Sequence, residues 1–433
     1  MNKVVVIGGG LAGCEASYQL LNRGINVDMY EMKPYKMSPA HHNENLCELV
    51  CSNSFKSTDI TTASGLLKAE LQKLDSLVLN CAYKCQVGAG SALAVDREQF
   101  SNMVTAKLKE FKNFNLINQE VKEIPSSCVV IIATGPLTSD DLSISLANLL
   151  SQSYLYFYDA CAPIINYDTI DMNKAFFGDR YGKGNNDYIN LPLTKEEYMT
   201  FYKELINAET VKLKEFEDIK VFEGCMPVEI MAKRGENTLR FGPLKPVGIT
   251  NPDGTKPYAV VQLRKEDNYN KLYNMVGFQT NLTFKEQKRV FGLIPALKNA
   301  EFVRYGVMHR NTFVNAPNVL KQTMQLKNNE NIFLAGQLSG VEGYLESVGS
   351  GLIAGINAYR LINNQQLLIL ENNTALGSLI NYTTNFVGKN FQPMHVNYGI
   401  IDSVNVKDAK MKKEAIYKNS MQSIDNFRRK YGI

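Results

Sequence analysis

The side chains with the widest chemical repertoire in this sequence are its cysteines, and one of them lies in the stretch VFEGCMPVE, residues 221–229. Cys225 could be a buried small hydrophobe, half of a disulfide, a metal ligand or a nucleophile. The cysteines do not cluster as they do in a small secreted disulfide framework, and in a reducing cytoplasm we expect thiols. Their positions are Cys14, Cys47, Cys51, Cys81, Cys85, Cys128, Cys161 and Cys225.

Two cysteine pairs, Cys47 with Cys51 and Cys81 with Cys85, have the spacing i, i+4, so neither is a C-x-x-C motif. A zinc site built from Cys47, Cys51 and His42 would lack the second ligand pair that the usual signature requires. We therefore predict no metal site.

The composition is that of an ordinary globular protein, with 433 residues of which 45% are hydrophobic and 21% charged. This length is ample for a large core and suggests two or three domains. Lys and Arg total 47 against 43 for Asp and Glu, an excess that allows an anionic partner without arguing for one. No run approaches the roughly 18 apolar residues of a membrane span, and MNKVVVIGGG is not a signal peptide. We expect a cytoplasmic protein that does not enter a membrane.

The residues that could hold a cofactor begin with a glycine-rich turn. Val4–Ile7 is an apolar run typical of a buried parallel strand, and the turn after it reads G-x-G-x-x-G. A helix is expected over 14–22, and a second strand over 27–31 ends on an acid. In such a βαβ unit the glycines let the backbone approach a pyrophosphate, and the acid binds the adenosine ribose. The predicted cofactor residues here are Gly8, Gly9, Gly10, Leu11, Ala12, Gly13 and Glu31.

Two later stretches favour FAD over NAD as that cofactor. The strand 129–132 runs into Ala-Thr-Gly, which is typical of two-dinucleotide-type flavoproteins, and the strand 332–334 runs into glycines and a helix from about 346. Such a late strand–glycine–helix unit usually covers the flavin end of FAD. Three separated segments would then build one FAD domain. The added cofactor residues are Ala133, Thr134, Gly135, Gly336, Gln337 and Gly351.

These elements predict an α/β fold, a Rossmann-like FAD-binding domain into which an α+β domain is inserted. We expect the FAD-binding domain over 1–164 and 306–433, and the inserted domain over 165–305. Periodicity predicts helices over 64–79 and 194–208, and strands over 258–263 and 272–278. From Lys407 the chain predicts a basic amphipathic helix, whose charges form either a solvated face or a phosphate-binding face.

A series of longer motifs makes the sequence resemble the TrmFO family, the folate- and FAD-dependent RNA uracil-5-methyltransferases once called small GidA-like proteins. The resemblance covers nearly the whole chain. Its carriers are VIGGGLAGCEA (6–16), ELVCSNS (48–54), LAVDR (93–97), FEGCMPVEIMAKRG (222–235), LRFGPLKPVG (239–248), YAVVQLR (258–264), VGFQT (276–280), FVRYGVMHRNTF (302–313), AGQLSGVEGYLES (335–347) and FQPM (391–394).

The resemblance implies a reductive methylation of uridine C5 in RNA. A one-carbon unit would pass from 5,10-methylenetetrahydrofolate through reduced FAD, which NADH or NADPH recharges. Because C5 of uracil is a poor nucleophile, a thiolate must add at C6. The cysteines of ELVCSNS and FEGCMP make Cys51 and Cys225 the catalytic candidates. We favour Cys225 as the C6 nucleophile and leave the assignment open; Cys14, Cys81, Cys85, Cys128 and Cys161 are interpreted as structural.

The resemblance also implies residues near the flavin, folate or RNA. A carboxylate suits the amino edge of a pterin, and a histidine could relay a proton or stack on the ring, although a structural histidine is a competing interpretation. The candidates are Arg304, His309, Arg310, Asn311, Glu342 and Glu346, and Arg240 with Lys245 could meet RNA phosphate.

At three places the chain departs from the pattern of these relatives. Phe55-Lys56 stands where most have Leu-Arg, 88–91 reads Gly-Ala-Gly-Ser instead of Pro-Ala-Gly-Gly, and His395 replaces an Asn. Lys cannot make the planar bidentate contact of Arg with phosphate. The RNA target therefore stays open between the T-loop uridine of tRNA and a uridine of 23S rRNA. Oligomeric state is also left open.

Other functions remain as alternatives. They are a larger GidA-type enzyme of the tRNA wobble uridine, a generic NAD(P)H-dependent flavin oxidoreductase, and a flavin-binding RNA-interaction protein without catalysis.

Overall fold

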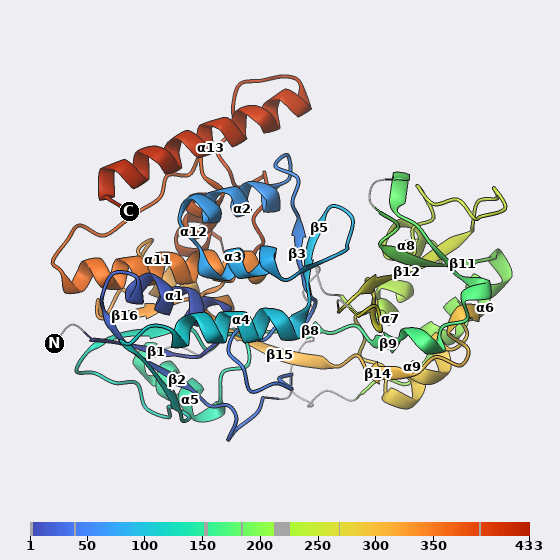
Figure 1. Ribbon diagram of the computed structural model, residues 1–433, viewed down its shortest axis with the longest axis horizontal. Helices are drawn as coiled ribbons and strands as arrows, with labels where there is room; N and C mark the ends of the chain where they lie inside the picture. Colours follow the sequence, from blue (N-terminus) through green and yellow to red (C-terminus); the bar gives the residue numbers. More distant parts are fainter. Residues whose placement is uncertain are drawn as a thin grey trace.

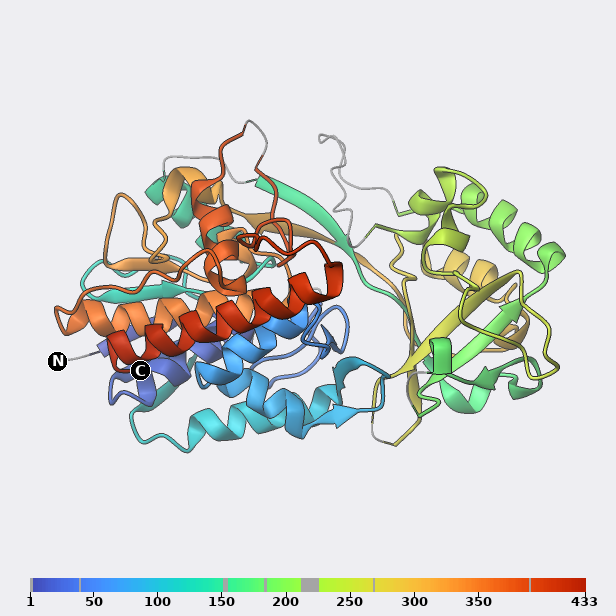
Figure 2. The same cartoon turned by 90° about the horizontal axis from the view of Figure 1, so that it is seen from above.

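The structure is a computed structural model that describes residues 3–38, 40–150, 155–182, 185–211, 226–267, 269–388 and 391–433. It has a larger body that carries both termini and a smaller body at one end, seen side-on in Figure 1 and from above in Figure 2. Buried apolar residues form two main clusters: one draws on the stretches 4–150 and 313–427, the other on 162–302. The domain boundaries at 164 and 305 stay a prediction.

The larger body is built on a five-stranded parallel sheet in the order β16-β7-β1-β2-β6. Its central strands are buried, as their apolar sequences predict. The α/β, Rossmann-like prediction is confirmed by this topology. The strands are β1 (Lys3–Ile7), β2 (Asn26–Glu31), β6 (Phe114–Asn118), β7 (Val129–Ile132) and β16 (Ile332–Leu334).

Helices α1 (Leu11–Leu21) and α11 (Tyr344–Ile362) cross each other in close contact over this sheet (Figure 1). A Cβ on Gly351 would lie 2.3 Å from the backbone oxygen of Ala12, and one on Gly355 would lie 2.6 Å from that of Ala16. The two glycines are therefore needed for the helices to approach. This contact packs a helix from the last third of the chain against a helix from the first third.

The helix predicted over 64–79 is wrong, because the chain breaks there into α2 (Ala63–Lys73) and α3 (Leu77–Lys84). Asp75 takes a left-handed φ of 56°, and the Ser76 hydroxyl caps α3 by accepting from the N–H of Leu79 at 3.2 Å. A serine that can bond a backbone N–H competes with helix continuation, and periodicity alone does not register that competition.

The remaining elements of the larger body cover the sheet or extend it. A small antiparallel sheet has the order β3-β5-β4, and the long α13 lies on the outside, close to α2 (Figure 2). Their bounds are α4 (Arg97–Lys109), α5 (Asp140–Leu150), α10 (Ala316–Val319), α12 (Ala375–Asn385), α13 (Ala409–Tyr431), β3 (Ser54–Ser57), β4 (Gln86–Val87) and β5 (Ala92–Val95).

The smaller body is α+β, with a six-stranded sheet in the order β10-β11-β12-β13-β9-β14. The antiparallel pair β8–β15 leads from the larger body toward it (Figure 1). The bounds are β8 (Leu155–Ala160), β9 (Ile164–Asn166), β10 (Phe176–Phe177), β11 (Tyr188–Leu193), β12 (Ala259–Lys265), β13 (Leu272–Met275), β14 (Phe302–Arg304), β15 (Met308–Phe313), α6 (Lys195–Asn207), α7 (Val228–Lys233), α8 (Thr238–Phe241) and α9 (Phe284–Phe291).

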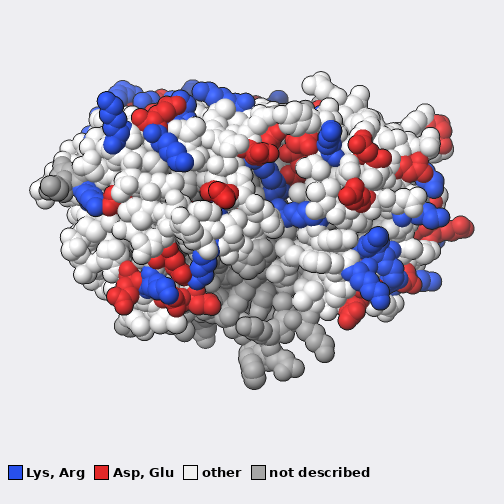
Figure 3. Space-filling view, turned by 60° about the horizontal axis from the view of Figure 1, so that its bottom comes forward, with Lys and Arg blue, Asp and Glu red and all other residues white. Residues whose placement is uncertain are grey.

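Charged side chains of both signs are interspersed on the face of the molecule drawn in Figure 3. This agrees with the small formal net charge of +4. None of the helices in the described ranges is long and apolar enough to span a membrane.

Candidate active site at the Cys51 loop

The three predicted cofactor segments meet at one edge of the parallel sheet. Neighbouring parallel strands β1, β7 and β16 all end there, so the residues that follow them come together. The N–H of Ala133 donates to the carbonyl of Ile7 at 2.8 Å, and that of Ala335 donates to Ile132 at 3.0 Å. A Cβ on Gly8 would lie 2.6 Å from the Ala133 oxygen. We call this place, formed by 8–13, 133–135 and 335–337, the glycine edge.

The glycine edge fits a dinucleotide. A Cβ built on Gly10 or on Gly135 would meet no atom within 4 Å, so open space faces the backbone at both positions. Gly10 is also the N-cap of α1, which has no side-chain cap and no acid in its first turn. The positive end of a helix therefore faces that space, an arrangement suited to a pyrophosphate.

Glu31 lies at the end of β2 and is largely buried. Its carboxylate accepts from the N–H of Gly9 at 2.7 Å and from that of Lys33 at 3.0 Å. The acid predicted to bind ribose thus also fixes the first glycine turn, and each of its oxygens keeps lone-pair capacity for a hydroxyl.

The side chain of Tyr344 holds the backbone of the loop that carries Cys51. The hydroxyl of Tyr344, the first residue of α11, accepts from the N–H groups of Cys51 at 2.9 Å and Ser52 at 3.1 Å. Phe55 packs against the Tyr344 ring with centroids 5.6 Å apart. Burial raises the pKa of the Tyr344 hydroxyl well above its usual value, so the group stays neutral.

Two arginines fix the carbonyl groups of the same loop. Arg97 donates to the oxygens of Leu49 at 2.5 Å and Cys51 at 2.9 Å, and its Nε lies 2.6 Å from Glu266. Arg304 donates to the oxygen of Val50 at 2.7 Å. Arg304 was predicted to lie near the flavin or folate; in the structure this hydrogen bond joins it to the loop backbone.

The smaller body reaches the loop through β12. Arg264 donates to the Ser52 hydroxyl at 2.8 Å and to the Asn53 amide oxygen at 3.1 Å, and the Asn53 amide donates to the Lys265 carbonyl at 2.9 Å. Asn53 is fully buried. The Cys51 loop is therefore bonded to both bodies at once.

Among the described cysteines, Cys51 and Cys128 are half-buried and the rest are buried. Burial raises the pKa of Cys81 to about 12 and also raises the pKa of Cys85 and Cys128. Cys128 precedes β7 at the opposite end of the sheet from the glycine edge, so Cys51 alone of the two lies near that edge. A reactive thiol needs access, which favours Cys51.

Cys161, which sequence reasoning treated as structural, lies next to the same loop. Its thiol donates to the Val50 oxygen at 3.4 Å, and it is buried. Cys225 lies outside the described residues, which resume at Met226.

Glu346 is fully buried in the first turn of α11, two residues after Tyr344. Its Oε1 accepts from the N–H of Val396 at 3.2 Å and lies 3.4 Å from the Lys56 ammonium. Its Oε2 is buried without a hydrogen-bond partner in the described part of the chain. A buried carboxylate oxygen in that condition points to a donor that the protein itself does not supply.

Lys56 and His395, two of the departures found in the sequence, lie against each other with Nζ and Nδ1 2.9 Å apart. His395 Nδ1 is also 2.7 Å from the carbonyl oxygen of Glu342, whose carboxylate accepts from Gln337 at 2.5 Å. Burial and then the Lys56 charge lower the pKa of His395 below its usual value. The imidazole is therefore neutral near pH 7.

The other predicted substrate residues lie on β15. Asn311 is buried, and the side chains of His309 and Arg310 lie outside what the structure describes. Arg240, predicted to meet phosphate, is already engaged: its guanidinium lies 3.7 Å from the centre of the Tyr258 ring and donates to the Tyr258 carbonyl at 3.0 Å. No group of three or more His, Cys, Asp or Glu suited to a metal occurs among the described residues.

Sequence reasoning missed the residues that hold the loop. Arg97 lies in LAVDR and Tyr344 in AGQLSGVEGYLES, so both were inside quoted motifs without a role. Arg264 likewise closes YAVVQLR. No local signal marks such roles, because each partner is far away in the sequence.

A family model, Glucose inhibited division protein A (GIDA), matches residues 3–366. The methylenetetrahydrofolate–tRNA-(uracil-5-)-methyltransferase TrmFO of Acetivibrio thermocellus is 55% identical over 420 residues, 97% of this chain and 96% of that protein. The protein of the same name from Bacillus subtilis strain 168 is 54% identical over 412 residues, 95% and 94% of the two chains. Among solved structures, Aquifex aeolicus GidA in its form II crystal superposes with a TM-score of 0.72 at 16% identity, covering 98% of this chain and 73% of that one.

Proposed function

The chain belongs to the TrmFO branch of the GidA family, and we propose that it methylates C5 of a uridine in tRNA with 5,10-methylenetetrahydrofolate as the one-carbon donor. The observation that carries the proposal is the position of Cys51. It is a half-buried cysteine on a loop that is bonded to both bodies, and Tyr344 of α11, next to the glycine edge, holds the backbone of that loop. The names of these relatives support tRNA as the substrate.

FAD is the proposed cofactor; when bound and reduced by NADH or NADPH, it would supply the hydride that turns the transferred methylene into a methyl group. The residues at 8–13 and 133–135 would hold its pyrophosphate, with Glu31 on the adenosine ribose. Gly336 and Gln337 would lie along its flavin end, whereas Gly351, also predicted there, packs against the Ala12 backbone and lets α11 approach α1. The open backbone at Gly10 and Gly135 supports this assignment.

Two thiols carry the chemistry on the uracil ring in this proposal. Cys225 adds to C6, which makes C5 nucleophilic, and Cys51 is the second thiol, which removes the C5 proton or protects the carbon being transferred. The Arg97 guanidinium, bonded to the Cys51 carbonyl, holds the backbone that carries this thiol. Tyr344 fixes the loop in one geometry.

Glu346 is proposed to receive the amino edge of the pterin through its unpartnered Oε2, with Glu342 beside it. Asn311, His309 and Arg310 of β15 would complete this folate side. Arg304 would act through the Val50 carbonyl, as a positioning residue for the Cys51 loop.

The test is incubation of purified protein with 5,10-methylenetetrahydrofolate and NADH or NADPH, together with unmodified tRNA and 23S rRNA transcripts in separate tubes. Mapping of 5-methyluridine should find it in tRNA, and only with folate. Modification of the 23S transcript alone would move the proposal to the rRNA target. NADH consumption without any 5-methyluridine would replace it with a generic flavin oxidoreductase.

A further inference from the structure

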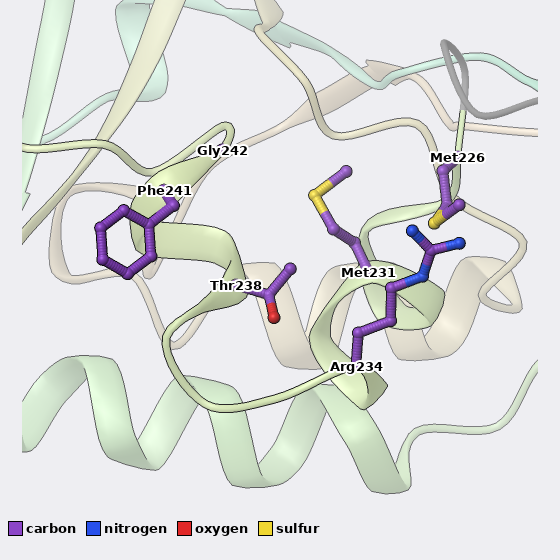
Figure 4. Close-up of a pocket in the computed structure, with 6 residues that line it drawn as sticks. All are labelled: Met226, Met231, Arg234, Thr238, Phe241 and Gly242. Atoms are coloured by element: carbon purple, nitrogen blue, oxygen red, sulfur yellow. The ribbon is translucent and has the colours of Figure 1, made fainter.

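An open pocket in the smaller body has no part in the site described above. It has a volume of about 440 Å³ and lies between α7 and α8, lined by Met226, Met231, Arg234, Thr238, Phe241 and Gly242. In Figure 4, Met226 and the Arg234 guanidinium lie on one side of it, Phe241 on the other, and Met231 between them. This volume suits one small ligand or one flipped-out group of a polymer.

The pocket is lined in part by polarisable thioether groups and an aromatic ring. Two thioethers and a phenyl ring give polarisable, flat surfaces of the kind that pack on a planar ring. Phe241 is 84% exposed, so its ring contributes little to the core of the domain. A large apolar side chain exposed beside an apolar pocket is typical of a binding site.

The rim of the pocket is basic. Arg234 lines it, and Lys233 and Lys245, which are close in sequence to lining residues, are exposed, as is the acid Glu236. Arg240 differs, because its guanidinium is held on Tyr258 and by the Asn237 amide oxygen at 2.9 Å, so it fixes the turn. Aromatic and thioether surfaces bordered by cations match the two chemical parts of RNA, stackable bases and phosphates.

One wall of the pocket, helix α7, is fixed by hydrogen bonds to residues 279–281. The N–H of Val228, where α7 begins, donates to the Gln279 carbonyl at 2.7 Å. The Glu229 carboxylate accepts from the Thr280 hydroxyl at 2.9 Å and from the Asn281 N–H at 2.8 Å. A pre-formed pocket binds without the entropic cost of ordering its walls.

We propose that this pocket is a subsite for an unpaired nucleobase of the RNA other than the target uracil, with Phe241 as the stacking surface and Lys245 on a neighbouring phosphate. The proposal rests on the proposed function, which supplies RNA as the substrate. The pocket is lined without any residue of the Cys51 loop, which supports a base other than the target. Met226 directly follows Cys225 in the sequence, which links the subsite to the proposed nucleophile.

The test uses the full-length, FAD-loaded protein and two variants. Phe241→Ala should raise the KM for the RNA transcript about tenfold, the loss expected for one stacked base, with little change in kcat. Phe241→Trp should keep the wild-type KM. Because the chain contains no other Trp, the fluorescence of that variant should be quenched when a single-stranded RNA oligonucleotide binds. Ile144→Ala, which removes an exposed apolar side chain from α5 of the larger body, is the control and should change neither quantity.

An unchanged KM in Phe241→Ala, or no quenching of Phe241→Trp by RNA that filter retention shows to be bound, would overturn the subsite. A concentration-dependent dimer that Phe241→Ala dissociates would assign the surface to a second copy of the chain instead. If the wild type makes no 5-methyluridine but the fluorescence responds to RNA, the proposed function fails and the subsite stands.

Discussion

The ammonium of Lys56 and Nδ1 of His395 are 2.9 Å apart, beside the fully buried Glu346. These are two of the positions at which the sequence departs from the pattern of its relatives, and they are 339 residues apart in the chain. Since one contacts the other, the two departures form one changed unit. Its Lys56 ammonium lies 3.4 Å from the carboxylate of Glu346, which is proposed to bind folate.

Lys56→Met should therefore weaken folate binding. Without the ammonium, Glu346 keeps a single hydrogen bond on Oε1, from the N–H of Val396, and loses the contact that helps to hold its carboxylate in place. We expect the KM for 5,10-methylenetetrahydrofolate to rise about five- to tenfold, the effect of about 1 kcal/mol or slightly more. Lys56→Arg keeps the charge and is the matched control; if Lys56→Met left this KM unchanged, the Lys56–Glu346 pair would have no part in binding.

The same variant should change the titration of His395. Burial and the Lys56 charge both lower the His395 pKa, so removal of the charge should raise it toward its ordinary value while leaving it lowered by burial. NMR of the imidazole resonances against pH would measure this. An identical His395 titration in both proteins would contradict the electrostatic contact.

Tyr344→Phe should uncouple the Cys51 loop from α11. The change leaves the N–H groups of Cys51 and Ser52 without their acceptor, at a cost of about 1–3 kcal/mol if they stay buried. We expect lower kcat with full FAD content, and faster alkylation of Cys51 by iodoacetamide, followed by peptide mass spectrometry. Phe55 packs on the same ring, so the phenyl contact is retained and the hydroxyl alone is tested.

The cysteine variants should separate into two groups. Cys225→Ser and Cys51→Ser should each abolish 5-methyluridine formation while FAD remains bound, because serine is a far weaker nucleophile at neutral pH. Cys128→Ser, at the far end of β7, should keep wild-type activity. Full activity in Cys225→Ser would remove that thiol from the mechanism.

The buried Glu70 should make stability fall as pH rises. It accepts from the N–H groups of Ala375 at 2.5 Å and Leu376 at 2.8 Å and from the Ser420 hydroxyl at 2.5 Å, so it joins α2 to α12 and α13. Burial raises the Glu70 pKa from 4.5 to about 7, although the hydrogen bonds oppose the shift. The folded protein thus holds the proton more tightly than the unfolded chain.

Its contribution is fully present below pH 4.5 and is lost as pH rises through about 7, by up to about 3 kcal/mol. Urea unfolding of wild type and Glu70→Gln at several pH values would test this. The variant, which cannot titrate there, should show a smaller fall in unfolding free energy. Parallel curves would assign the pH dependence to other groups.

Part of this site was readable in the sequence because its signals are local. Strand, glycine turn, helix and acid follow one another within 31 residues, and the apolar strands of a parallel sheet have few other places to lie. The strand order then places the segments of Gly10, Gly135 and Gly336 at the same edge of the sheet.

The rest depends on contacts between distant residues. The Tyr344 hydroxyl reaches a loop 293 residues away, and Arg264 reaches Ser52 across 212 residues. The helix break at Asp75 and Ser76 was also missed. The helical spacing of apolar residues continues through the break, and it does not show that Ser76 caps a new helix. Hydrogen bonds between residues far apart in the chain produce no repeating pattern in the sequence, so they could not be predicted from it.

The bonds of Arg264 and Asn53 across the two bodies have a mechanical consequence. Any rotation of the smaller body about the β8–β15 pair must stretch the bonds from β12 to residues 52–53, in a loop that Tyr344 anchors to α11. The Cys51 loop is therefore a tether between the bodies, and how far they can swing apart is limited by the same residues that place the thiol.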